Sequence, residues 1–398
     1  MMLQPGVSSA PLDISFTPAA TIGESSLSRL ISNPIIQSFD LSPDGKTVAL
    51  LVAAGSKVGA PLWLAIEEIA TKHVTVSHEL GPSVFPAGGF SPQVLYASHQ
   101  RYLIVQDLQT IRVFDSESLK SLRTISPPPG KESQTPLFVI GASNSDVFVC
   151  AFGPQQKFNP RFHTTPVRVE IADISSGELL GEWASVDVPQ SISPNGDLIA
   201  VSSSQARQGI LPLNVLDVRG KKVAELTGGF SFIKDADQSN PLGRVLGFFV
   251  NSQELLLTPD ENIDQTGNHS GDSLQLVSIT GKQVQVQQTI KPPHYGPTGE
   301  IAVSADHKSA VVISWYVPAP ALAHEGALPA SSPELLLLER AAGFQVDAAL
   351  SIHGFGLKVS GWLENRRPRL SSEGSVIAIA QDSGVTVLTK GPLPKKQP

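Results

Sequence analysis

The sequence predicts an all-β fold, a seven-bladed β-propeller whose blades are four-stranded antiparallel sheets. Three observations lead to this prediction. A β-hairpin with a tight turn recurs along the chain, and its first turn returns every 45 to 67 residues or so, a period typical of four-stranded propeller blades. The second strand of each hairpin is apolar on both faces, as expected of strands that lie between neighbouring blades.

The hairpin is clearest at 38–52, SFDLSPDGKTVALLV. Two extended runs flank its SPDG turn, in which Pro43 presets φ for the first central position and Asp44 can cap the turn with its carboxylate. Gly45 supplies the φ > 0 that ends the turn. The same hairpin returns, intact or degenerate, at 190–203, 302–314 and 369–380.

Each predicted unit consists of a first and a second hairpin. The first six units are expected at 35–52 with 62–76, 96–107 with 110–125, 138–152 with 167–183, 190–203 with 213–226, 245–258 with 273–290, and 302–314 with 334–350. The seventh unit has the hairpin at 369–380 and then only one more strand, Val385 to Thr389.

The N-terminal region carries one extra strand, Asp13 to Thr17, and the seventh unit lacks one. We expect these segments to pair, with Asp13–Thr17 as the outer strand of the last blade, because an unpaired sheet edge invites aggregation. The expected regions are an N-terminal segment with the closing strand at 1–34, the seven-bladed propeller at 35–391 and a C-terminal tail at 392–398.

The turns also suggest a family. The SPDG and SPNG turns, together with second-hairpin turns of the form D-x-x-S/R-G-K/E at Asp173 to Glu178 and Asp217 to Lys221, resemble those of YVTN and lactonase-like seven-bladed propellers, which are related to WD-repeat (WD40-like) proteins. This resemblance covers most of the chain and implies the propeller fold. The absence of Gly-His and Trp-Asp repeat dipeptides argues against a true WD-repeat member, and no acidic set matches a lactonase metal site.

The amino-acid composition limits the classes of partner that this protein is expected to bind. Charged residues make up 16% of the chain, the net charge is −7, and no stretch concentrates Lys or Arg enough to follow a phosphate backbone, so no nucleic acid is expected. The sequence shows neither a membrane span nor a signal peptide. We expect a soluble, monomeric protein that is cytoplasmic as written, or exported or periplasmic if a signal sequence is missing from this chain. Cys150, the single cysteine, lies in an apolar run and is expected to be buried.

Tight turns within hairpins and long connections are expected on opposite rims of the ring. Long loops on a rigid scaffold are where binding usually resides, and Arg and aromatic side chains are common interface anchors. The predicted partner-binding residues on the long-loop rim are Phe158, Arg161, Phe162, His163, His294, Tyr295, Arg366 and Arg367. Two other interpretations stay open: the phenylalanines could pin their loop onto its blade, and the arginines, with Arg369, could form a solvated turn.

Residues 260–272 weakly resemble a calcium loop. Asp260, Asn262 and Asp264 occupy its first three ligand positions, but Gln265 replaces the glycine of the sixth position and Gly271 the glutamate of the twelfth. A solvated acidic loop fits better, and no cofactor is predicted. The GDSL signature of esterases at 271–274 lacks the sheet-and-helix context of that family, so we interpret it as coincidence.

These observations favour a non-catalytic propeller that binds a protein or peptide partner through its long-loop rim. One alternative is a lactonase-like or other hydrolase with a metal at the central channel, which three or more carboxylate or histidine ligands at the channel mouth would support. The other is a structural module of an exported assembly, which a periplasmic location would support.

Overall fold

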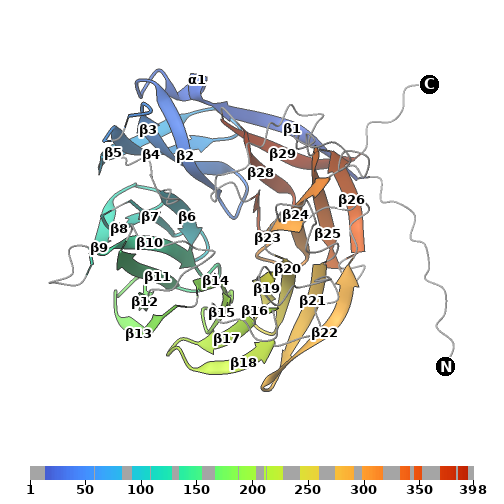
Figure 1. Ribbon diagram of the computed structural model, residues 1–398. Helices are drawn as coiled ribbons and strands as arrows, with labels where there is room; N and C mark the ends of the chain where they lie inside the picture. Colours follow the sequence, from blue (N-terminus) through green and yellow to red (C-terminus); the bar gives the residue numbers. More distant parts are fainter. Residues whose placement is uncertain are drawn as a thin grey trace, which may run out of the picture.

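The chain folds as a β-propeller, a ring of small antiparallel sheets around a common centre (Figure 1). The fold is taken from a computed structural model. The structure describes residues 14–57, 59–82, 92–107, 109–127, 134–154, 166–186, 188–202, 210–211, 213–226, 243–259, 274–290, 298–316, 332–340, 345–351, 368–381 and 384–392. The all-β prediction is confirmed.

Four sheets of four strands follow the chain in simple up-and-down order. The first holds β2 (Pro34–Leu41), β3 (Thr47–Ala54), β4 (Pro61–Glu68) and β5 (Val74–Pro82). The second holds β6 (Gln93–Ala97), β7 (Tyr102–Gln106), β8 (Ile111–Asp115) and β9 (Ser121–Ile125). The third holds β10 (Gln134–Gly141), β11 (Val147–Pro154), β12 (Val167–Asp173) and β13 (Leu179–Ser185). The fourth holds β23 (Thr298–Val303), β24 (Ser309–Tyr316), β25 (Ser332–Glu339) and β26 (Gln345–Ser351).

A nine-stranded sheet lies between the third and fourth of these along the chain. One antiparallel run in it is β14 (Val188–Ile192), β15 (Leu198–Ser202), β17 (Leu213–Asp217) and β18 (Lys222–Leu226). The other is β19 (Gly243–Asn251), β20 (Glu254–Pro259), β21 (Leu274–Thr280) and β22 (Gln283–Ile290). A single pair, Glu225 with Gln283, joins β18 to β22, and the short β16 (Ile210–Leu211) adds to β19 in parallel.

The last sheet contains both ends of the described chain. Its order is β1 (Ile14–Gly23), β29 (Gly384–Pro392), β28 (Val376–Gln381) and β27 (Arg369–Leu370), so the N-terminal strand is the outer strand of this sheet. Figure 1 shows β1 and β29 side by side although they come from opposite ends of the sequence. Ring closure by the N-terminal strand is therefore confirmed.

The closing strand is longer than the predicted segment, which ended at Thr17. Thr17 lies opposite Thr389, and the strand continues past it, so that Ile22 lies opposite Val385. The register shifts between Pro18 and Ala20, where a bulge carries the chain past a proline that has no N–H to donate to a ladder. The sequence suggested that the strand ended there.

The closing strand is followed by a short helix, α1 (Glu24–Leu27). Leu27 is fully buried and Ile31 nearly so, and both join the hydrophobic cluster between the closing sheet and β2–β5. No helix in the described part of the chain is long and apolar enough to cross a membrane.

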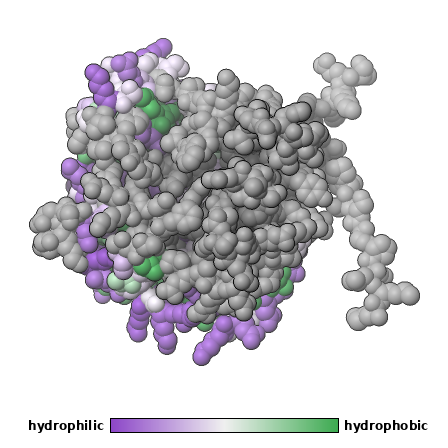
Figure 2. Space-filling view, in the orientation of Figure 1, coloured by the Kyte–Doolittle hydropathy of each residue, from purple (hydrophilic) through white to green (hydrophobic). Residues whose placement is uncertain are grey.

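The hydrophobic core is divided into clusters that lie between neighbouring sheets. The closing strand contributes to two of them: Phe16 packs with β24, β25 and β28 on one side, and Ile22 packs with β2 and β3 on the other. Cys150 is fully buried in such a cluster, as predicted, and burial raises the pKa of its thiol. Hydrophilic residues gather on the outer edge of the ring, over β18 and β22 (Figure 2).

Candidate functional site

The predicted site residues form two groups, and both lie outside the residues that the structure describes. They are the partner-binding set Phe158, Arg161, Phe162, His163, His294, Tyr295, Arg366 and Arg367, and the metal set Asp260, Asn262 and Asp264. These predictions stay predictions. The described residues include both rims of the ring, and the features below belong to them.

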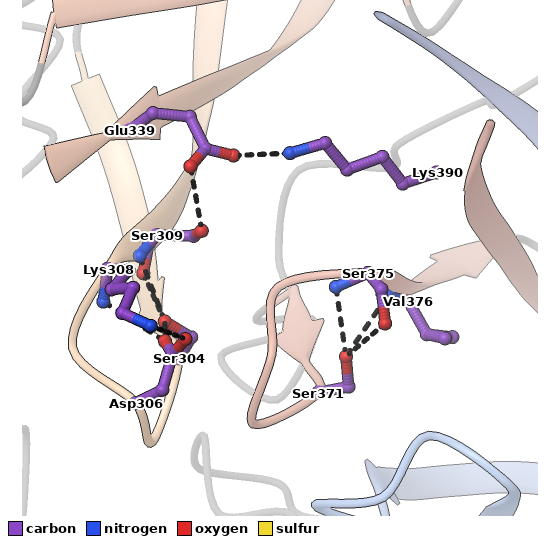
Figure 3. Close-up of polar contacts among 9 residues, drawn as sticks. All are labelled: Ser304, Asp306, Lys308, Ser309, Glu339, Ser371, Ser375, Val376 and Lys390. Carbon is purple, nitrogen blue, oxygen red and sulfur yellow. Dashed lines mark hydrogen bonds and ion pairs between the residues drawn. The ribbon is translucent and has the colours of Figure 1, made fainter. Parts of the chain in front are cut away.

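The tight turns share a buried serine. Ser42 begins the SPDG turn, and its Oγ accepts hydrogen bonds from the backbone N–H groups of Lys46 (3.1 Å) and Thr47 (2.9 Å) while donating to Asp44 Oδ1 at 2.7 Å. Ser42 is 0% exposed, and these hydrogen bonds within the turn satisfy its hydroxyl in the absence of solvent. Ser193, Ser304 and Ser371 begin equivalent turns and make equivalent bonds, two of them drawn in Figure 3.

Neighbouring tight turns are bonded to one another around the ring. The backbone bonds are Ser372 N to Pro43 O (2.7 Å), Ser98 N to Ala142 O (3.2 Å), His99 N to Ser143 O (2.8 Å), Asn144 N to Pro194 O (3.0 Å) and Asp306 N to Ser372 O (3.0 Å). The tight-turn rim therefore uses much of its own backbone hydrogen-bonding capacity, which leaves fewer groups for a partner.

An ion pair crosses the inner wall of the ring between the closing sheet and its neighbours. Arg369 Nε on β27 lies 2.7 Å from Asp40 Oδ1 on β2, and Asp40 Oδ2 accepts the backbone N–H of Tyr96 on β6 at 2.7 Å. Burial raises the pKa of Asp40, in opposition to the nearby guanidinium. The guanidinium also lies 5.8 Å from the centroid of the Phe39 ring. The Asp40 carboxylate therefore connects three sheets: its own, the closing sheet through Arg369, and the sheet of β6 through Tyr96.

This ion pair corrects the interpretation of Arg369 as part of a solvated turn. Its side chain is only 23% exposed and is paired with Asp40. The reason is ring closure: β27 lies beside β2, which is more than three hundred residues earlier in the chain, and supplies a buried carboxylate.

A second ion pair holds the closing sheet on its other side. Glu339 on β25 accepts hydrogen bonds from Lys390 Nζ on β29 at 2.7 Å and from Ser309 Oγ on β24 at 3.3 Å (Figure 3). The closing sheet is thus connected to both neighbours by partly buried charges, besides its hydrophobic clusters.

The rim opposite the tight turns has a groove of about 920 Å³ in its described part. Ser25, Ser28 and Asn33 line it from the connection between β1 and β2, and Ser56 and Lys57 line it from the connection between β3 and β4. Gly55 and Gly59 line the same wall, and both have φ > 0. A Cβ at either position would meet nothing within 4 Å, so the backbone at these two residues is open to the groove.

A smaller cavity, of about 160 Å³, lies at the mouth of the central channel on the tight-turn rim. The ends of the inner strands β10, β14, β19 and β23 surround it. Its lining includes the apolar residues Phe248 and Val250 and the polar residues Ser143 and His307. No group of three His, Cys, Asp or Glu side chains within the described ranges is placed to hold a metal ion.

Glu67 on β4 is a buried carboxyl with an unusual environment. It is 0% exposed, Oε1 has no hydrogen-bond partner among the described residues, and Oε2 accepts only the Ser26 hydroxyl of α1 at 3.2 Å. Burial raises the pKa of Glu67, with Ser26 and Lys72 acting in the opposite direction.

We expect Glu67→Gln to stabilise the protein by about 1 kcal/mol at pH 7. Because the folded-state pKa is raised, the folded chain binds the Glu67 proton more tightly than the unfolded chain. Stability from this group is therefore present below the ordinary glutamate pKa and is lost as pH rises through the raised value. Urea unfolding from pH 4 to 8 should show the two proteins converging at low pH and the variant gaining as pH rises. A gain that is constant with pH would contradict the buried charge.

Comparisons with known proteins identify the fold. No family model matches the chain, and no curated protein matches it. The β-propeller domain of Cps50 (Swd1) from Myceliophteria thermophila has a TM-score of 0.54 and 12% identity, covering 94% of this chain and 99% of that chain. A chain of the mitotic checkpoint complex has a TM-score of 0.51 and 11% identity, covering 98% and 97%. An oligogalacturonate lyase in complex with manganese has a TM-score of 0.54 and 11% identity, covering 89% and 88%.

At such identities the likeness shows the β-propeller fold and nothing further. Propellers carry unrelated functions, and function depends on the site that each one bears.

Proposed function

We propose that this protein is a non-catalytic scaffold that binds a protein or peptide partner through its long-loop rim. The observation that carries the proposal is the groove beside α1, because it lies on that rim and is lined by small polar side chains and open backbone at Gly55 and Gly59. Exposed backbone and hydroxyl groups suit the main chain of an extended peptide. A volume near 920 Å³ is within the range of ligand sites.

An exposed leucine beside the groove supports a protein partner. Leu30 lies in the same connection as Ser28 and Asn33, and its side chain is 57% exposed, the largest fraction among the exposed large hydrophobic residues of the described chain. A single exposed leucine is ordinary, but next to a groove it can serve as an apolar contact. The proposal includes Arg161, Phe162, Tyr295 and Arg366, which the sequence predicts as partner-binding residues of this rim.

We also infer that the ring has seven blades. The two runs of the nine-stranded sheet meet through one residue pair only, and a hydrophobic cluster lies between their faces, with Val215 on one side and Leu255 on the other. Packing face to face is how neighbouring blades contact each other, whereas strands of one sheet pair along their edges. Counting the two runs separately gives seven groups of four strands and seven clusters between them.

The proposal can be tested with a random peptide library displayed on phage. Selected peptides should bind with a Kd in the micromolar range, and Phe162→Ala, Tyr295→Ala and Arg366→Ala combined, or Leu30→Ser alone, should weaken binding by about 30-fold or more if they include a hot spot. The matched control combines Lys46→Ala, Lys221→Ala and Lys282→Ala on the tight-turn rim, which should leave the Kd within about twofold.

Selection of peptides that lose affinity only in the lysine variant would overturn the assignment of the working rim. Hydrolysis of a simple lactone that needs added Ca²⁺ and disappears in Asp260→Asn with Asp264→Asn would instead support the hydrolase alternative.

A further inference from the structure

The short helix α1 contacts the buried Glu67 carboxyl, and a charged Glu67 lacks hydrogen-bond donors there. The Ser26 hydroxyl of α1 lies 2.8 Å from the Gly23 carbonyl oxygen and 3.2 Å from Glu67 Oε2. A hydroxyl has one proton to donate, and the carbonyl is the nearer acceptor. A charged Glu67 then receives no hydrogen bond from the described residues, since Oε1 has no partner either.

Protonation of Glu67 gives every proton of this group an acceptor. A neutral carboxyl can donate to Ser26 Oγ while Ser26 donates to the Gly23 carbonyl. The Glu67 side chain is 0% exposed, so water does not supply the hydrogen bonds that a charged form lacks, and an unpaired buried charge is costly. The protonated form thus connects β4, α1 and the end of β1 through two hydrogen bonds.

The surroundings of Glu67 compensate little for a negative charge. Val48 on β3 and Val74 on β5 lie opposite Glu67 in the sheet. Ala65, on the same face of β4, packs in the cluster to which the closing sheet contributes alanine, valine and isoleucine side chains. The charged group that acts on Glu67 is Lys72, whose exposed side chain lies in the turn after β4. Water screens an exposed ammonium, and burial, the larger effect, raises the pKa of Glu67.

We propose that Glu67 is a pH-sensitive anchor for α1. The protonated carboxyl donates to Ser26 and holds α1 against β4, whereas loss of the proton breaks this hydrogen bond and lets α1 open locally. Leu27 is fully buried, so the opening stays local. The anchored state binds the proton more tightly than the opened state. Anchoring is therefore complete below the ordinary glutamate pKa of about 4.3 and is lost as pH rises through the raised value.

The anchor lies beside the groove, because Ser25 and Ser28, on either side of Ser26, line it. Opening of α1 at high pH therefore changes the shape of the groove wall. This consequence rests on the proposed function of the groove, whereas the anchor itself does not. A test of the anchor needs no partner, so its failure would leave the proposed function standing, and a failed peptide selection would leave the anchor standing.

Hydrogen exchange of the Leu30 and Ile31 amides tests the anchor in the full chain. Both amides donate to the Leu27 carbonyl at 2.9 Å and close the turn at the end of α1. Labelling times are scaled to the intrinsic exchange rate at each pH. We expect the protection of both amides to fall about tenfold from pH 4.5 to pH 8, because a pKa difference of one unit between anchored and opened states changes the opening equilibrium tenfold.

Glu67→Gln is the decisive variant, because a side-chain amide can donate to Ser26 at every pH. It should keep the protection that the natural chain has at low pH, with no fall as pH rises. The matched control is Glu68→Gln. Glu68 is next in the chain, but it is exposed and accepts the Thr71 hydroxyl at 2.6 Å, so this variant should keep the pH dependence.

Any of three results would refute the anchor. The first is protection of the Leu30 and Ile31 amides that does not change with pH in the natural chain, a measurement that depends on no variant. The second is a fall in protection that persists in Glu67→Gln. The third is a fall that disappears in Glu68→Gln.

Discussion

Replacing Gly45 with valine should lower the free energy of unfolding by about 3–5 kcal/mol, through a strained backbone and a steric clash that add together. The backbone at Gly45 has φ +71°, which a β-branched residue rarely adopts. A Cβ at this position would also lie 2.8 Å from Val376 Cγ2 on the neighbouring closing sheet. Because the clash is between sheets, the substitution should loosen the ring at its closure as well as strain the turn.

Urea unfolding of Gly45→Val should be compared with Gly281→Val. Gly281 has a similar φ, +60°, in the tight turn between β21 and β22, but a Cβ there would meet nothing within 4 Å. The control should therefore lose only about 1–3 kcal/mol, the part due to the backbone. Equal losses in the two variants would show that contact between the turn and Val376 contributes nothing measurable.

The conformation of the SPDG turn could be predicted because it depends on residues within the turn itself. Pro43 and Gly45 specify a turn whatever surrounds them, and the left-handed glycine expected at the end of the turn is confirmed. The turn that follows β6 was not predictable in the same way. Three consecutive residues, Ser98, His99 and Gln100, have φ of +52°, +51° and +74°, although none is glycine. Bonds from Ser98 and His99 to the next sheet hold this turn, and such tertiary contacts leave no local signal in the sequence.

In the candidate site, too, contacts between distant parts of the chain could not be predicted from the sequence. The pairing of Arg369 with Asp40 depends on ring closure, which brings β27 beside β2. The sequence around Arg369 shows only its neighbours Arg366 and Arg367, so the pairing could not be predicted from it. His307 stands fourth in a turn whose SPDG and SPNG equivalents end in glycine, so this departure was visible in the sequence as a degenerate form of the same hairpin.

Deleting residues 1–23 should have the largest effect, a loss of about 4–7 kcal/mol, because it removes the whole closing strand. Phe16 and Ile22 are 4% and 0% exposed and pack against different neighbouring sheets, so both interfaces of the closing sheet lose contacts. The backbone groups of β29 that pair with β1 would also lose their partners. Since each kcal/mol shifts the Tm of a chain this long by about 1.2 °C, the Tm should fall by about 5–8 °C.

The matched control deletes residues 1–13, which precede β1, and should keep the Tm within about 2 °C of the full chain, as expected where no described strand is touched. The longer deletion should also form dimers or larger species in size-exclusion chromatography, because it exposes β29 as an unpaired edge. If both deletions melt alike and stay monomeric, β1 does not close the ring in solution. A Tm loss confined to the longer deletion, together with association, would establish that the two ends of the chain stabilise the propeller as one sheet.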